Sequence, residues 1–180
     1  MVKQKVSPKV GVIMGSDSDL PVIEEALDVL EEFEIPFEVR ILSAHRSPDE
    51  TSAYARSCSD RGLRVLIAAA GWAAHLAGVL AAESILPVIG VPINSSPLQG
   101  LDSLLSTVQM PPGIPVATMA IGKGGARNAA LFAVQILALQ EPLLSEKLKS
   151  FREKMTEDIL KNKSRKLEDY LFRRTSGGSK

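Results

Sequence analysis

Short runs of β-branched and apolar residues alternate along the chain with longer segments of helical period. Residues 10–14 and 37–42 read as strands, and the segment between them, 20–33, has apolar residues at helical spacing. The same alternation predicts strands at 64–70, 88–91 and 116–120, and helices at 48–60, 73–83, 102–108 and 126–139. Because parallel strands need crossover connections, this order predicts an α/β fold with a parallel sheet of about five strands. The handedness of such crossovers leaves a flavodoxin-like or Rossmann-like three-layer α/β/α sandwich.

A different pattern begins at Pro142. One apolar helix stripe follows at steps of three and four residues, formed by Leu144, Leu148, Phe151, Met155 and Ile159. A long C-terminal helix over 143–170 would measure roughly 40 Å, more than a compact domain of this size spans, so we expect much of the stripe to lie on another subunit. We therefore divide the chain into an N-terminal extension (1–9), a flavodoxin-like domain (10–141), a helical extension that packs on a neighbouring subunit (142–172) and a flexible tail (173–180).

Composition and charge exclude several classes of protein. Apolar residues make up 45% of the chain, and 21 basic residues balance 21 acidic ones, so neither disorder nor nucleic-acid binding is expected. The basic residues near the C-terminus alternate with acidic ones, which is typical of a solvated helix face. The longest apolar run, 65–82, is interrupted by Gly71, His75 and Gly78, so no membrane span is predicted. No signal sequence is recognised at residues 1–14, and a cytoplasmic protein is expected.

The single cysteine and the two histidines give no metal-binding pattern. Cys58 has no Cys or His beside it and reads as an ordinary thiol. His45 and His75 are not at metal-ligand spacing, so we expect no metal.

Unusual polar residues follow the ends of the predicted strands, where ligands bind in doubly wound sheets. Both histidines of the chain fall in these loops, which cover residues 15–19, 43–49, 71–75 and 122–126. The first loop has neither a dinucleotide fingerprint nor a Walker P-loop. Its residues Ser16, Ser18 and Asp19 suit either an anion site or plain helix capping, and the spacing leaves both open. Asp17 and Asp19 suit ribose hydroxyls better than a phosphate.

The second loop carries the more informative pair. Arg46 offers a planar charged fork for a phosphate, and His45 is of the one residue type that titrates near neutrality. A lone histidine is often structural, and no Ser-His-Asp triad is defined here.

Together these loops resemble the N5-carboxyaminoimidazole ribonucleotide mutases, enzymes of purine synthesis. The resemblance covers residues 10 to about 140. It rests on Met-Gly-Ser-Asp-Ser-Asp (14–19), Ser-Ala-His-Arg-Ser-Pro-Asp (43–49), Ala-Gly-x-Ala-Ala-His-Leu-x-Gly (70–78), Gly-Leu-Asp-Ser-Leu-Leu-Ser-x-Val-Gln-Met-Pro (100–111) and Pro-Val-Ala-Thr-x-Ala-Ile-Gly (115–122). Asn128, Ala129 and Ala130 also agree with the family pattern.

The resemblance implies a flavodoxin-like subunit in a homo-octamer, without metal or organic cofactor, whose C-terminal helix docks on a neighbour. It implies carboxylate transfer between the two carboxyaminoimidazole ribonucleotides, with a small-molecule ribonucleotide and CO2 as partners. His45 would move the proton as the catalytic residue. The implied substrate-binding residues are Ser16, Asp17, Ser18, Asp19, Ser43, Ala44, Arg46, Ala70, Gly71, Ala73, Ala74, His75 and Leu76.

The chain departs from the family pattern at three positions. Trp72, Ala77 and Val79 stand where the pattern has Gly, Pro and Met. If the glycine adopts a positive φ, Trp72 would either turn outward with strain or fill part of the site. On this basis, Trp72→Gly is expected to raise turnover or affinity.

The sequence leaves three alternatives to mutase activity. A related branch carboxylates aminoimidazole ribonucleotide with free CO2, and its third loop typically reads Ala-Gly-Arg-Ser-Asn, so His75 favours the mutase. A non-catalytic binder of a phosphorylated ribonucleotide, with its site blocked by Trp72, is a second alternative. Flavin binding is the least supported alternative, because the sequence has no clear aromatic pair to enclose an isoalloxazine.

Overall fold

Five parallel strands form a single sheet in the order β2-β1-β3-β4-β5. This computed structural model describes residues 7–176. The strands are β1 (Val10–Met14), β2 (Phe37–Ile41), β3 (Val65–Ala70), β4 (Val88–Pro92) and β5 (Ala117–Thr118). β1 pairs with both β2 and β3, with Val10 opposite Phe37 and Val65. This strand order is that of flavodoxin-like proteins and confirms the predicted fold class.

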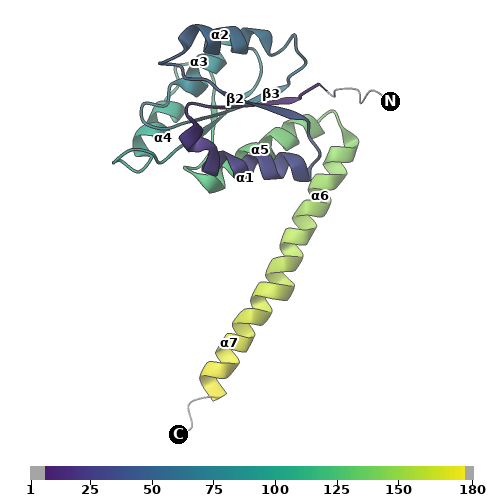
Figure 1. The fold of residues 1–180 in the computed structure, drawn as a ribbon. Helices are drawn as coiled ribbons and strands as arrows, with labels where there is room; N and C mark the ends of the chain where they lie inside the picture. The colour runs from purple at the N-terminus through teal and green to yellow at the C-terminus, as the bar shows by residue number, and fades with distance from the viewer. Residues whose placement is uncertain (1–6, 177–180) are drawn as a thin grey trace. The chain divides into compact units, whose positions relative to one another are not determined.

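Helices cover both faces of the sheet. They are η1, a 3-10 turn (Asp17–Asp19), α1 (Leu20–Glu32), α2 (Pro48–Ser57), α3 (Leu76–Glu83), α4 (Leu101–Val108) and α5 (Lys123–Ala138). In Figure 1, α2 and α3 lie on one face of the sheet, and α1 and α5 lie on the other. Each crossover helix begins beside the carboxyl end of the preceding strand, so the loops at that edge lie next to one another.

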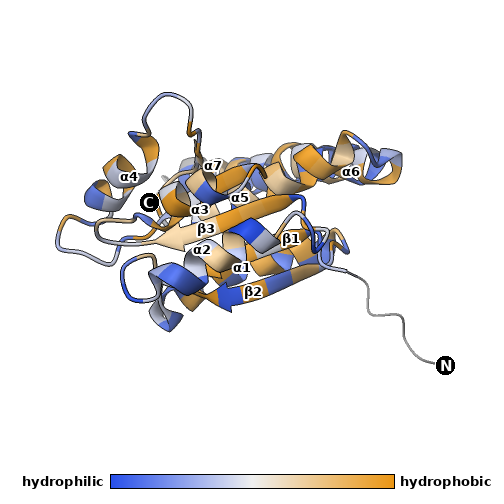
Figure 2. Cartoon of the chain, turned by 90° about the horizontal axis from the view of Figure 1, so that it is seen from above, coloured by the Kyte–Doolittle hydropathy of each residue, from blue (hydrophilic) through white to orange (hydrophobic). Residues whose placement is uncertain are grey.

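The burial of each strand depends on its place in the sheet. Every residue of β1 and β4 is buried, and β3 is buried except at Ala70, because helices cover both faces there. The edge strand β2 is only partly buried. Figure 2 shows this difference, with β3 coloured hydrophobic and hydrophilic stretches in β2. The residues that pack around Ile13, Leu66 and Leu80 form a core between the sheet and the α2–α3 layer.

Several element boundaries differ from those expected, including the end of α2 at Ser57 rather than 60. Helix α3 begins at Leu76 rather than 73, because Trp72 and Ala74 have positive φ values that interrupt a helical path. Helix α5 begins at Lys123 rather than 126, so the glycines that follow β5 belong to its first turn. Gly125 lies so close to the Ala120 carbonyl that a Cβ atom would overlap it, which explains glycine in this helix. Strand β5 contains only Ala117–Thr118 of the five residues expected.

The chain divides into two compact units between Leu137 and Ala138. The second unit contains α6 (Pro142–Glu157), the π-helical segment η2 (Asp158–Lys163) and α7 (Ser164–Ser176). The predicted long C-terminal helix is therefore present, and it continues to Ser176 rather than 172. Within the apolar stripe, Leu144 is buried, whereas Met155 and Ile159 are each 52% exposed. The outer parts of the predicted terminal extensions, residues 1–6 and 177–180, lie outside the described residues.

Candidate functional site

A cavity of about 420 Å³ lies at the carboxyl ends of β1, β2, β3 and β4. Its walls come from the loops that follow these four strands. The lining residues are Gly15, Ser16, Ser18, Asp19, Ser43, Ala44, His45, Arg46, Ala70, Gly71, Trp72, Ala73, Ala74, His75, Leu76 and Ser95. The volume is in the range of small-molecule sites, so the strand-end loops form a pocket of suitable size for a ligand.

The structure brings together every predicted site residue except one. Asp17 does not line this cavity and instead faces an adjoining one, which it shares with Ser43 and Arg46. Gly15 and Ser95 line the main cavity but were absent from the predicted set. The signal for Ser95 was available, since it follows β4 at the same edge of the sheet as the other loops.

The loop after β1 both caps a helix and lines the cavity. The Ser16 hydroxyl accepts a hydrogen bond from the Ser18 backbone N–H (3.3 Å), and the Asp19 carboxylate accepts one from the Ser16 N–H (3.2 Å). Burial raises the pKa of Asp19, opposed by the Ser16 N–H and by the positive charge of Arg46. Helix capping and ligand binding are therefore compatible in this loop, because the capping hydrogen bonds fix side chains that also line the cavity.

Arg46 joins the first two loops. Its Nη2 donates to the Gly15 carbonyl (2.6 Å) and its Nε to the Ser43 hydroxyl (3.4 Å). The Ser43 hydroxyl also accepts from the Arg46 backbone N–H (3.2 Å). These bonds use two of the five guanidinium donors, so the others remain to bind an anion in the cavity.

His45 and His75 come from different loops and are in direct contact. Nε2 of His45 is hydrogen-bonded to Nδ1 of His75. The rings meet edge to face, with centroids 4.7 Å apart and planes at 89°. One of these nitrogens must donate and the other accept, so both rings cannot be fully protonated while the contact persists. The pair therefore places a group that can gain and lose a proton at the cavity wall.

The loop after β3 has an unusual backbone. Trp72 has φ = 52° and Ala74 has φ = 28°, and the turn is closed by a hydrogen bond from the Ala74 N–H to the Gly71 carbonyl (3.0 Å). Gly71 lies against Ser95, and a Cβ at position 71 would overlap the Ser95 hydroxyl. The close approach of the loops after β3 and β4 therefore favours glycine at 71.

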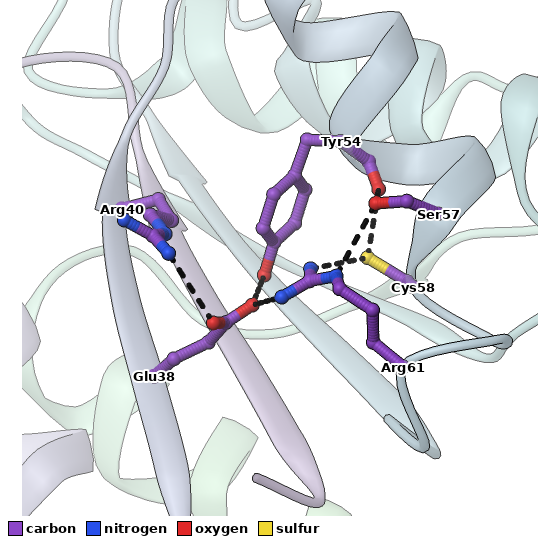
Figure 3. A network of polar contacts seen from close by, with 6 residues as sticks. All are labelled: Glu38, Arg40, Tyr54, Ser57, Cys58 and Arg61. Carbon is purple, nitrogen blue, oxygen red and sulfur yellow. Dashed lines mark hydrogen bonds and ion pairs between the residues drawn. The ribbon is translucent and has the colours of Figure 1, made fainter. Parts of the chain in front are cut away.

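A polar network joins β2 to α2, the elements on either side of the His45–Arg46 loop (Figure 3). Glu38 accepts hydrogen bonds from Tyr54 (2.8 Å) and Arg61 (2.7 Å). The Arg61 guanidinium lies 4.9 Å from the Tyr54 ring centroid. Burial alone would raise the pKa of Glu38, but the bonds from Arg61 and Tyr54 outweigh it and lower that pKa. The network thus holds an ionised carboxylate between the strand and the helix.

Cys58 belongs to the same network. Its thiol is buried and donates to the Tyr54 carbonyl (3.1 Å), and burial raises its pKa. It lies outside the residues that line the cavity. Such a thiol is poorly suited to nucleophilic chemistry.

Comparison with known proteins identifies the family. A family model described as AIR carboxylase matches residues 9–158, which is most of the chain. The chain belongs to the AIR carboxylase family. Its members include an N5-carboxyaminoimidazole ribonucleotide mutase of Pyrococcus abyssi, 62% identical over 148 residues, which cover 82% of this chain and 84% of the relative. The mutase of Pyrococcus horikoshii is 53% identical over 167 residues, 93% of each chain.

A solved structure extends the agreement with the AIR carboxylase family to three dimensions. The crystal structure of Treponema denticola PurE has a TM-score of 0.78 and 29% sequence identity to this chain. The match covers 88% of this chain and 98% of PurE.

Between residues 7 and 176, no three His, Cys, Asp or Glu side chains lie together in a way that could hold a metal ion. In the same range, no helix has the length and apolar character needed to cross a membrane.

Proposed function

We propose that the chain is an N5-carboxyaminoimidazole ribonucleotide mutase, an isomerase of purine biosynthesis. Both Pyrococcus relatives described above carry that name. In this chain, the observation that carries the proposal is the contact of His45 with His75 in a cavity that also presents Arg46 and Asp19. That arrangement combines a proton-transfer group with anchors for an anionic, hydroxylated ligand.

The first two loops would hold the ribonucleotide. Arg46 is the cationic group for the phosphate, held in place by Gly15 and Ser43. The Asp19 carboxylate would accept hydrogen bonds from ribose hydroxyls, and the hydroxyls of Ser16 and Ser18 would complete the binding site. In this proposal Ser43 has a helping role, because it positions Arg46.

His45 would act first as an acid and then as a base. The protonated imidazole donates its proton to the carbamate nitrogen, the carbon–nitrogen bond breaks, and CO2 leaves with the neutral amine as product. The enamine-like ring carbon then attacks CO2 and forms a carbon–carbon bond. His45 removes the proton from that carbon, which restores the aromatic ring and the protonated imidazole. No proton is gained or lost over the cycle.

The loop after β3 would hold CO2 between these two steps. It carries Gly71, Ala73 and Ala74, whose small side chains and backbone line part of the cavity, and His75, which contacts His45. Holding the gas against the ring carbon makes recombination faster than escape. We assign Ala70, Gly71, Ala73, Ala74, His75 and Leu76 to this function.

The deciding experiment compares two substrates in one product assay. Freshly made N5-carboxyaminoimidazole ribonucleotide should be converted without added bicarbonate, and aminoimidazole ribonucleotide with bicarbonate should react far more slowly. Turnover only with bicarbonate would instead indicate the direct carboxylase. Binding of ribonucleotide without either reaction would indicate a non-catalytic binder.

We also propose how the protein is assembled and where it acts. Residues 10–141 would form the catalytic domain and 142–172 would pack on a neighbouring copy, in a homo-octamer. Exposed apolar residues on α6 and η2, such as Met155 and Ile159, support such packing. Catalysis through His45 requires neither metal nor cofactor. One unpaired cysteine in the sequence supports a cytoplasmic location.

A further inference from the structure

Trp72 is the only tryptophan of the chain, and it lies on the wall of the candidate site. Its side chain is 60% exposed although it lines the cavity, so the ring is at the rim rather than in the interior. No Phe or Tyr is among the residues that line this cavity. Trp72 therefore provides the largest flat apolar surface that a ligand there would meet.

The indole does not block the cavity. A volume of about 420 Å³ remains open with Trp72 in place. The expectation that Trp72→Gly raises affinity assumed that the ring occupies the space of the ligand. The open volume and the exposure of Trp72 instead favour the other alternative, a ring that is turned outward.

The backbone holds this ring at the site in a costly conformation. Trp72 has φ = 52°, in the left-handed region that residues other than glycine, asparagine and aspartate rarely adopt. The hydrogen bond from the Ala74 N–H to the Gly71 carbonyl closes the turn around it. Strain of this kind concentrates at binding sites, where the strained residue has a use.

We infer that Trp72 is a substrate-contact residue whose indole stacks on the aminoimidazole ring of the bound ribonucleotide. This inference rests on the proposed function. Arg46 and Asp19 would anchor the phosphate and the ribose, which leaves the heterocycle to contact the remaining walls. Stacking of a heterocycle on an aromatic side chain stabilises binding without requiring a particular hydrogen-bond pattern.

The test uses the intrinsic fluorescence of the single tryptophan and two probes. Aminoimidazole carboxamide ribonucleotide has the heterocycle, and ribose 5-phosphate does not. Calorimetry first establishes binding of each probe to the wild-type protein. At saturation, the ribonucleotide should change the emission of Trp72 and protect it from acrylamide, and ribose 5-phosphate should do neither. Unchanged emission with the ribonucleotide bound, or a ring already shielded from acrylamide without ligand, would overturn the inference.

Two variants provide a second measurement. Trp72→Gly should bind the ribonucleotide about ten-fold more weakly and ribose 5-phosphate equally well, and Trp72→Phe should retain most of the affinity. Equal or tighter binding of the ribonucleotide by Trp72→Gly would contradict stacking. If neither probe binds the wild-type protein, the proposed function fails and the inference fails with it. If the ribonucleotide binds without affecting Trp72, only the inference fails.

Discussion

His45 and Arg46 are adjacent in the chain, yet the structure gives their side chains different partners. His45 contacts His75 from the loop after β3, and Arg46 contacts Gly15 from the loop after β1. In the proposed function, His45 would therefore transfer the proton and Arg46 would bind the anion. Substitutions at the two positions should therefore affect different kinetic parameters.

His45→Asn should greatly reduce turnover while retaining substrate binding. General acid–base catalysis typically contributes about 10²–10⁴-fold, so kcat should fall by about that factor with Kd changed only a few-fold. The measurement is steady-state kinetics together with calorimetric binding of ribonucleotide.

Arg46→Gln is the matched comparison for His45→Asn. It keeps hydrogen-bonding capacity but removes the charge, so KM should rise by about ten-fold or more with a smaller change in kcat. Near-full activity of the His45 variant would contradict the role assigned to that histidine.

Gly71→Ala should destabilise the protein and weaken ligand binding, because its Cβ would overlap the Ser95 hydroxyl. A cost of about 1–3 kcal/mol in the free energy of unfolding is expected for such overpacking. Thermal unfolding and calorimetric binding measure the two effects. Ser95→Gly should restore much of the stability in the double variant, because it removes the overlapping atoms. If the losses in free energy of unfolding were instead additive in the double variant, a steric overlap between positions 71 and 95 would not be their cause.

At the scale of elements, the Glu38 network ties β2 to α2 and so supports the loop between them. Glu38→Gln should lower the free energy of unfolding at about pH 7 by about 1 kcal/mol, because Arg61 is partly exposed and solvent screens its charge. The folded-state pKa of Glu38 is lowered from 4.5. Its stabilising contribution is therefore present above that value and is lost as the pH falls through the folded-state pKa.

Denaturant unfolding at several pH values checks this expectation. The difference between the wild-type protein and Glu38→Gln should be largest near neutrality and should shrink below about pH 4. Glu24→Gln is the control, since Glu24 is exposed on α1 and outside the network. A difference that stays constant with pH would show that ionised Glu38 is not the stabilising group.

The elements were more predictable than the turns between them. Buried runs such as 10–14 and 65–70 stand out in the sequence because a strand covered on both faces has few polar residues. The start of α5 was not predictable, because Gly124 and Gly125 read as loop residues. The close packing of Gly125 on Ala120 explains glycine at that position of the helix, and nothing in the structure explains Gly124.

The location of the candidate site was predictable from the order of the expected strands. Strand order places the four loops at one edge of the sheet, so the gathering of Ser16, Arg46 and His75 followed from the expected topology. The direct contact between His45 and His75 did not, because side-chain contacts between loops depend on their tertiary arrangement. A positive φ at position 72 was considered from the sequence, and the structure has it; whether the ring turns outward or fills part of the site was left open.

At the scale of the whole molecule, exposed apolar residues on the C-terminal helix should mediate assembly. Met155→Lys combined with Ile159→Lys should lower the mass of the oligomer, because charge at these half-exposed apolar positions opposes burial against another copy. Light scattering after size-exclusion chromatography measures that mass. Thr156→Lys combined with Asn162→Lys adds the same charge at exposed polar positions and should leave it unchanged. An unchanged mass in the first variant would contradict the assembly role of this stripe.

The central claim is that one closed site moves the carboxylate within a single substrate molecule. The most direct measurement supplies N5-carboxyaminoimidazole ribonucleotide labelled isotopically in its carboxylate, with excess unlabelled bicarbonate, and analyses the product by mass spectrometry. His45→Asn under the same conditions corrects for spontaneous loss of the label. Retention of the label is the predicted result, because CO2 held beside His45 recombines before it escapes. Loss of the label to the bicarbonate pool would contradict the account and indicate release of CO2 to solvent.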